Sequence, residues 1–204
     1  MTTVDFYFDP ICPWCWITSR WLRDVAARRD VDVRWRPFSL LVKNYEMEGG
    51  HGNEEHRHRY AATHELLRLI EAARADDGEA AADALYLEAG RRIHHDKERW
   101  PDPADLLTAA GLPATLASAA ADAAWDESIR ASMQRAIEIA GYDVGVPLLV
   151  FDDERGFFGP VFSPRPEGQA ALDVFDAIEV LAGQPGFWEL KRGRDVGPDV
   201  GERP

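Results

Sequence analysis

Cys12 and Cys15 are the two cysteines of this 204-residue chain, and they stand three positions apart in the stretch CPWC. At this spacing on a helix the second sulfur lies one turn from the first, so the pair can cycle between a dithiol and a disulfide. The same pair could instead supply half of a zinc site, or could be two inert buried thiols. The surrounding residues favour one of these three interpretations.

A zinc site needs about four ligands, so the six histidines of the chain would have to complete it. No histidine pair has a matching spacing near CPWC. The chain therefore predicts a redox or thiol-transfer pair, and no bound metal is expected.

The residues around CPWC predict a strand followed directly by a helix. Residues 4–9 alternate apolar and polar side chains, which is the period of a strand. Cys12 then stands where an N-cap would, and Pro13 suits the first helical position. The free N–H groups and the positive dipole end of a helix lower the pKa of a thiol placed there. We expect Cys12 to be the attacking thiolate and Cys15 to resolve the mixed disulfide.

The remaining elements follow from hydrophobic periodicity. A second strand is expected over 31–35, and helical patterns fill about 40–142, where Asn53 can cap a helix that ends near Gly78. An antiparallel hairpin follows, with one strand over 147–151 and the other beginning at Phe157, and a last helix covers about 172–181. The predicted order is βαβ, a helical block, then ββα.

Composition limits the class of function. A formal net charge of −13 argues against nucleic acid, because phosphate backbones need clustered Lys and Arg. The N-terminal residues show no export signal, and no apolar run is long enough to cross a membrane. We expect a cytoplasmic protein without a membrane partner, in which a close cysteine pair is more often catalytic than structural.

The chain resembles the DsbA family of thioredoxin-like proteins. The resemblance is carried by the strand before CPWC, the helical block, and the GVP that precedes the closing hairpin. It implies an α/β thioredoxin-like fold with an all-helical insertion. It also implies that Pro147 is cis and faces the dithiol, and that Val146 offers backbone hydrogen bonds to a bound thiol substrate.

Five stretches narrow the resemblance to the mycothiol-dependent nitroreductase group: FDPICPWCWITSRW, SLLVKN, GRRIHH, FFGPV and FWELKR. It implies reduction by mycothiol or a mycothiol-linked redoxin, and transfer of electrons to oxidised thiols or nitroaromatic compounds. Mycothiol would be a co-substrate. No tightly bound cofactor is expected, since no GxGxxG follows a strand.

The expected domains are a thioredoxin-like domain of residues 1–40 and 143–192, a helical lid of 41–142, and a flexible tail of 193–204. Pro13 and Trp14 hold and cover the dithiol turn, and Trp14 could form an aromatic wall for a planar substrate. Asp9, just before the dithiol, could accept the Cys15 proton or cap its loop.

Three residues of the helical block have both a functional and an ordinary interpretation. Asn44 could give an amide to the substrate, or cap a turn. His94 could face the site as a proton donor, or bond helix carbonyls. His56 could point from the insertion toward the cysteines, or belong to a solvated basic face.

Two other functions share these features. A general oxidoreductase or isomerase of the same superfamily would act on a protein or a polyketide-type substrate. A non-catalytic binding module would keep the fold and use its groove only to hold a partner. The chain could form a homodimer, and its sequence leaves the oligomeric state open.

Overall fold

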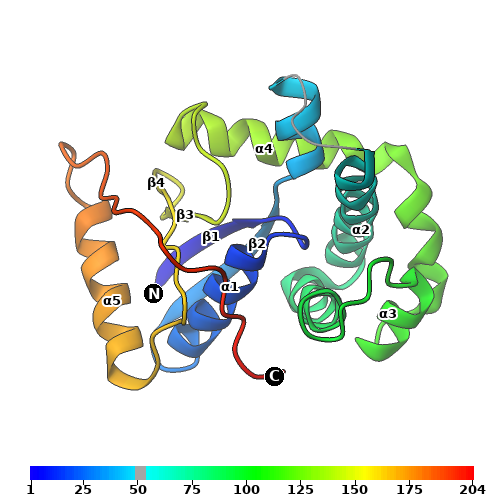
Figure 1. Ribbon diagram of the computed structural model, residues 1–204, viewed down its shortest axis with the longest axis horizontal. Helices are drawn as coiled ribbons and strands as arrows, with labels where there is room; N and C mark the ends of the chain where they lie inside the picture. Colours follow the sequence, from blue (N-terminus) through cyan, green and yellow to red (C-terminus); the bar gives the residue numbers. More distant parts are fainter. Residues whose placement is uncertain (49–53) are drawn as a thin grey trace.

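A computed structural model describes residues 1–48 and 54–204 of the chain (Figure 1). The first unit is β1 (Thr2–Phe8), α1 (Pro13–Ala26) and β2 (Val31–Pro37). The closing unit is β3 (Leu148–Phe151), β4 (Arg155–Phe158) and α5 (Gly168–Ala182). Helices fill the chain between these two units, which confirms the predicted order of elements.

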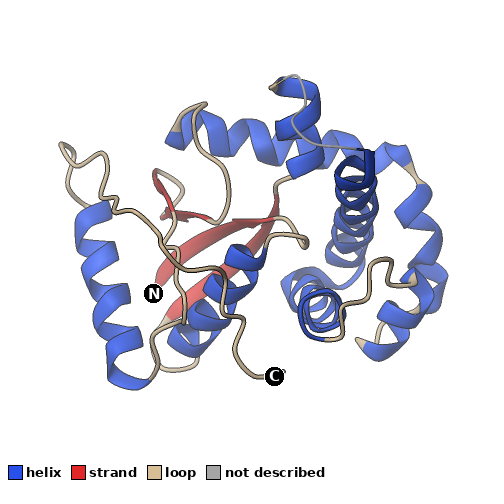
Figure 2. Cartoon of the chain, viewed as in Figure 1, coloured by secondary structure: helices blue, strands red, loops and turns tan. Residues whose placement is uncertain are grey.

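The four strands form one mixed sheet in the order β2-β1-β3-β4 (Figure 2). β1 runs parallel to β2, and the register pairs Phe6 with Trp35. β3 runs antiparallel to both β1 and β4. The central position of β1 fixes the loop after it, which leads into CPWC, at the middle of the sheet edge.

The two faces of β1 bury different side chains, as its alternation predicts. Phe6 meets the ring of Trp35 edge-on at 5.4 Å, and the ring of Phe8 lies 4.0 Å from that of Tyr86. On the opposite face, Asp5 accepts hydrogen bonds from two arginines of β2. In Figure 1 α1 lies below the sheet and α4 above it.

The long helix α2 (Glu54–Gly90) is two helices joined at a kink, where Gly78 has a φ of 78°. Glycine adopts this left-handed conformation without a steric penalty, so the expected helix end at Gly78 is confirmed as a bend. The π-helical turn η2 (Arg91–His95) continues directly from Gly90. Asn53, the expected cap, lies outside the described residues.

The other helical elements are short until α4. They are the π-helical turn η1 (Val42–Met47), α3 (Pro103–Ala109), the 3₁₀ helices η3 (Ala114–Ala121) and η4 (Ala123–Trp125), and α4 (Asp126–Ala140). Asp102 caps α3 through its side chain, and Gly141 ends α4 with a φ of 96°. Within the described residues no helix is both long and apolar enough to cross a membrane.

The expected start of the last strand was wrong. The sequence predicts a strand from Phe157 onward, but β4 spans Arg155–Phe158 and stops before Gly159. The Gly159–Pro160 peptide bond is cis, and Gly159 has a φ of 97°. Because proline cannot donate to a strand ladder, pairing ends there.

Candidate active site

Cys12 is the N-cap of α1, and Pro13 takes the first helical position, as predicted. The Cys15 backbone N–H donates to the Cys12 sulfur at 3.4 Å. Cys12 is 7% exposed and Cys15 is fully buried, and both are free thiols. The helix start thus presents one sulfur at the edge of the fold and keeps the other behind it.

The pKa values of the two thiols move in opposite directions. The Cys15 thiol donates to the Cys12 sulfur and, with the Cys15 and Trp14 backbone N–H groups, lowers the pKa of Cys12. Burial, followed by the hydrogen bond to Cys12 and then the negative charge on Cys12, raises the pKa of Cys15 well above its usual value. A thiolate at Cys12 beside a protonated Cys15 is the arrangement that nucleophilic attack requires.

The Val146–Pro147 peptide bond lies beside the dithiol although 134 residues separate Val146 from Cys12. The Cys12 thiol donates to the Val146 carbonyl oxygen at 3.7 Å, and the peptide bond to Pro147 is cis. The Gly159 N–H in turn donates to the Pro147 carbonyl at 2.7 Å. The closing hairpin therefore positions the cis-proline loop against Cys12.

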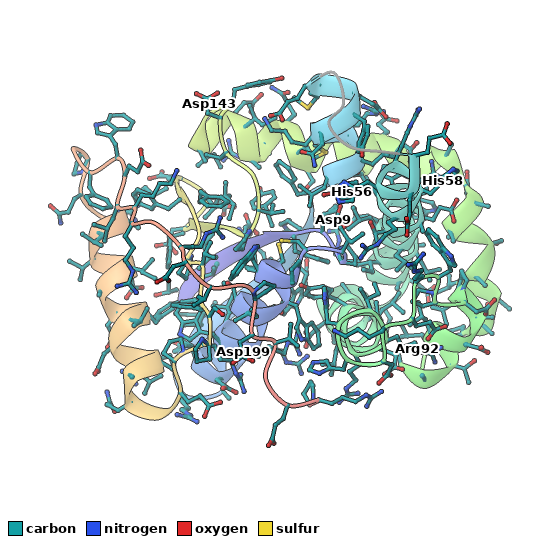
Figure 3. The ribbon with its side chains drawn as sticks, viewed as in Figure 1. Asp9, His56, His58, Arg92, Asp143 and Asp199 are labelled. Carbon is teal, nitrogen blue, oxygen red and sulfur yellow. The ribbon has the colours of Figure 1, made fainter. Side chains whose placement is uncertain are left out.

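Asp9 is fully buried in the loop between β1 and CPWC (Figure 3). Its carboxylate accepts from the Ile11 N–H at 3.0 Å and from the Leu40 N–H at 2.8 Å. Burial raises the pKa of Asp9 to about 6, against the lowering effect of these bonds. Asp9 thus fixes the dithiol loop to the chain after β2, and it can exchange a proton near neutral pH.

His94 lies behind the dithiol loop. It is 6% exposed, and its Nε2 is 2.9 Å from the Pro10 carbonyl oxygen. Burial lowers the pKa of His94 to about 4, so the ring is neutral at pH 7 and Nε2 carries the proton that this carbonyl accepts. The ring also stacks on Trp16 at 5.7 Å. The structure therefore gives His94 a contact that orients the dithiol loop.

Trp14, Asn44 and His56 are placed at different depths. Trp14 and Asn44 are half-buried, on α1 and η1 respectively, and His56 is exposed near the start of α2. The His56 ring lies 5.0 Å from that of Tyr60, edge to face. Figure 3 shows His56 close to Asp9 in projection.

Tyr60 joins these residues, although its spacing in the sequence suggests only a place in the apolar stripe of α2. Burial raises the pKa of Tyr60, and the charges of Asp9 and Cys12 raise it further, while a hydrogen bond with Asn44 lowers it. Its ring lies 5.8 Å from that of Tyr45, whose buried hydroxyl has no partner among the described residues. Only contacts between distant segments distinguish Tyr60 from a packing residue.

Two pockets of the described residues lie away from the dithiol. Within residues 1–48 and 54–204, no group of three or more His, Cys, Asp or Glu side chains is arranged to hold a metal ion. A pocket of about 240 Å³ adjoins the second half of α2, after the kink, and a pocket of about 260 Å³ adjoins the first half. Neither is lined by Cys12 or Trp14.

A dithiol at a helix start, following the central strand of a mixed sheet and facing a cis-proline loop, defines a thioredoxin-like fold of the DsbA type with a helical insertion. Solved structures agree. A probable DsbA oxidoreductase of Streptomyces coelicolor has a TM-score of 0.55 at 24% identity, covering 98% of this chain and 97% of that one. The cytosolic disulfide reductase DsbM of Pseudomonas aeruginosa has a TM-score of 0.55 at 20% identity, over 87% and 99%.

Residues 11–192 match the Rv2466c-like family, described as mycothiol-dependent nitroreductase Rv2466c. The uncharacterised protein Rv2286c of Mycobacterium tuberculosis is 36% identical over 196 residues, which cover 94% of this chain and 82% of that protein. The chain belongs to the Rv2466c-like family of DsbA-type proteins, as the resemblance predicted.

Proposed function

We propose that the protein is a thiol–disulfide oxidoreductase in which Cys12 is the nucleophile and Cys15 the resolving thiol. The observation that carries this proposal is the geometry at the start of α1, where the Cys12 sulfur accepts from the Cys15 backbone N–H at 3.4 Å and Cys15 is fully buried one turn behind it. The Val146 carbonyl at 3.7 Å from the Cys12 sulfur marks where a bound thiol partner would lie. The family match and the DsbA-type neighbours support a redox enzyme.

The catalytic cycle balances without a bound cofactor. The Cys12 thiolate attacks a substrate disulfide, forms a mixed disulfide and releases one substrate thiolate. Cys15 then loses its proton, attacks the Cys12 sulfur and releases the second thiolate, leaving the protein disulfide. Two low-molecular-weight thiols reduce that disulfide in turn and leave as their own disulfide.

We infer that the reductant is mycothiol or a mycothiol-linked redoxin, and that oxidised thiols or nitroaromatic compounds accept the electrons. The family description supports mycothiol, and the P. aeruginosa reductase has also been solved with GSH, at a TM-score of 0.57 and 19% identity. One dithiol supplies two electrons and two protons, which convert a nitro group to a nitroso group and water. A reducing cytoplasm, where such thiols are kept reduced, is part of this proposal.

The proposed substrate site lies between the two expected domains, 1–40 with 143–192 and the helical insertion 41–142. Trp14 and Pro13 would form its wall on α1, and Val146 with Pro147 its floor. Asn44, His56 and Tyr60 would face it from the insertion. Their polar groups suit a sugar hydroxyl or a nitro oxygen, which accept or donate hydrogen bonds.

Stopped-flow reduction of the oxidised protein by mycothiol, glutathione and thioredoxin, followed by tryptophan fluorescence, tests this function. Trp14 and Trp16 flank Cys15 and report opening of the disulfide. We expect fast reduction by mycothiol. A response to thioredoxin alone would instead favour the general oxidoreductase or isomerase that acts on protein or polyketide-type substrates.

Two serine variants separate the roles of the cysteines. Cys12→Ser is expected to abolish turnover. In Cys15→Ser, the Cys12 thiolate should attack the disulfide form of the low-molecular-weight thiol, release one thiolate and stay trapped as a mixed disulfide that mass spectrometry detects. Turnover by the Cys12→Ser variant would contradict the proposal. Unchanged binding of a partner, with no redox activity in the wild-type protein, would identify a binding module.

A further inference from the structure

The C-terminal segment of residues 193–204, here called the strap, follows the family match, which ends at residue 192. In Figure 1 it leaves the α5 side, crosses in front of α1 and ends beside the helical insertion. Asp199 marks the crossing in Figure 3. The sequence predicts a flexible tail here, and the structure gives contacts with the rest of the chain to Arg194, Gly197, Asp199, Arg203 and Pro204.

Three sets of contacts hold the strap. The Arg194 guanidinium lies 4.7 Å above the ring of Trp14. Ser163 donates to the Gly197 carbonyl at 2.6 Å and accepts from the Asp199 N–H at 3.0 Å.

The far end of the strap is fixed to η2 and the residue after it. Arg203 donates to both carboxylate oxygens of Asp96, at 2.9 and 3.0 Å, and Arg91 donates to the Pro204 carbonyl at 2.8 Å. Arginine and carboxylate in this two-bond geometry fix direction as well as distance. The strap is therefore attached on both sides of the dithiol helix.

Each attachment is made to an element that contributes to the dithiol region, α1 at one end and η2 at the other. Trp14, which Arg194 covers, lies between the two cysteines. Asp96, which Arg203 binds, follows the two histidines of η2 that contact Pro10 and Trp16. Cys12 itself is only 7% exposed.

We propose that the strap is a size filter, which lets low-molecular-weight thiols and small acceptors reach Cys12 and excludes folded protein disulfides. This inference rests on the proposed function and selects the small-molecule substrate class within it. Trp14 covered by Arg194 narrows the approach along α1, and the attached end closes the side toward η2. A protein substrate needs a wide groove to bring its own backbone beside Val146, whereas a small thiol does not.

The strap can detach without unfolding the protein. Arg203 and Asp96 are each nearly half exposed, and exposed ion pairs contribute little to stability. Loss of the strap should therefore change access to Cys12 while the sheet and α1 stay intact. A change in access to Cys12 without a change in folding would distinguish a size filter from a segment that only stabilises the fold.

The test measures alkylation of Cys12 in a Cys15→Ser background by iodoacetamide and by a maleimide carrying a long polyethylene glycol chain. In a variant that ends at Arg192 we expect labelling by the bulky reagent to rise about tenfold, and labelling by iodoacetamide to change less than about twofold. Arg194→Ala and Arg203→Ala should give intermediate increases. Circular dichroism and thermal melting verify that each variant is folded.

Two further variants sharpen the result. Arg29→Ala is the matched control, because Arg29 makes the same kind of exposed pair, with Asp176, between the end of α1 and α5. It should leave both labelling rates unchanged. Combining Asp96→Arg with Arg203→Asp restores the pair with its charges exchanged and should restore exclusion of the bulky reagent.

Each outcome decides the matter. Equal acceleration of both reagents would overturn the size filter, and so would no change in either rate. No labelling by iodoacetamide in any variant would refute the nucleophilic Cys12 and the filter with it. With both cysteines present, the truncated protein should also gain the ability to reduce insulin disulfides, which the intact chain would lack.

Discussion

At the residue scale, the loop before Cys12 is held by two buried titratable groups from different segments. Asp9 binds the Ile11 and Leu40 N–H groups, and His94 binds the Pro10 carbonyl. Burial favours the neutral form of both side chains, so it raises the pKa of Asp9 and lowers that of His94. The consequences for stability have opposite signs.

The sign follows from proton binding in the folded and unfolded states. Asp9 has a pKa of about 6 when folded, against 3.8 for an aspartate exposed in the unfolded chain, so its stabilising contribution is complete below 3.8 and is lost as pH rises through about 6. His94 has a pKa of about 4 when folded, against 6.5, so its contribution is complete above 6.5 and is lost as pH falls to about 4. Each contribution amounts to about 3 kcal/mol in full. Between pH 4 and 6 the loss of the Asp9 contribution with rising pH is nearly balanced by the gain of the His94 contribution.

We therefore predict opposite pH dependences for Asp9→Asn and His94→Phe. Relative to the wild type, the free energy of unfolding of Asp9→Asn should rise by about 2 kcal/mol from pH 4 to 6, and that of His94→Phe should fall by a similar amount. Lost hydrogen bonds shift each curve by a constant, so the slope is the readout. Urea denaturation at several pH values measures it.

The exposed His58→Phe variant is the control and should follow the wild-type curve. Parallel curves for the wild type and Asp9→Asn would show that the Asp9 carboxyl titrates normally. Removing the Asp9 charge should also lower the pKa of Cys12, which that charge raises. The pH dependence of iodoacetamide labelling reports this shift.

At the element scale, α1 and the end of α2 approach so closely that only glycine fits between them. A Cβ atom on Gly90 would lie 2.1 Å from Cζ3 of Trp16, which is fully buried. Trp16 is held in place by the indole N–H that donates to His95 Nε2 at 3.1 Å, and by the Arg20 guanidinium 4.2 Å above its ring. The ring therefore cannot move away easily.

Gly90→Ala is predicted to destabilise the protein by about 2 kcal/mol, because overpacking in a core outweighs the gain of about 1 kcal/mol from alanine in a helix. Chemical denaturation measures the change. Gly186→Ala, where an added Cβ meets nothing within 4 Å, should be nearly neutral. If Gly90→Ala were as stable as the wild type, the description of α1 packed closely on α2 would be wrong. Adding Trp16→Phe to Gly90→Ala should recover part of the lost stability, because the smaller ring makes room for the Cβ atom.

At the scale of the whole molecule, Glu79 joins the helical insertion to the sheet. One carboxylate oxygen accepts from the Trp35 backbone N–H at 2.9 Å, and the other accepts from Arg36 at 2.9 Å. Arg36 also donates to the buried Asp5 at 2.9 Å, which continues the network into β1. Glu79 directly follows the kink at Gly78, so the bend in α2 is what brings it to β2.

Glu79→Ala should lower the free energy of unfolding by about 2 kcal/mol, since it leaves the Trp35 N–H without its acceptor and removes one of the two carboxylates that Arg36 binds. Glu79→Gln keeps an acceptor for the N–H and should cost about half as much. Glu65→Ala, an exposed site on the other half of α2, is the control. Equal losses for Ala and Gln would mean that the charge, and not the hydrogen bond, holds the insertion to the sheet.

The sequence by itself determined the local features of this protein. The alternation of residues 4–9, Cys12 at an N-cap followed by Pro13, and glycines at Gly78 and Gly141 fixed the strand, the dithiol helix and two helix ends. These depend on backbone conformation and on neighbours a few residues away, which the order of amino acids specifies directly. The Cys12 and Cys15 spacing predicts redox chemistry for the same reason.

Only the tertiary structure decided what surrounds the dithiol. The contact of Val146 with Cys12, the bond from His94 to Pro10, the approach of Tyr60 and the passage of Arg194 over Trp14 all join segments far apart in the chain. Such contacts depend on how the whole sheet and its helices pack, because burial and shape, and not local spacing, select which distant residues meet. His94 and Tyr60 therefore have surroundings that their positions in the sequence leave undecided.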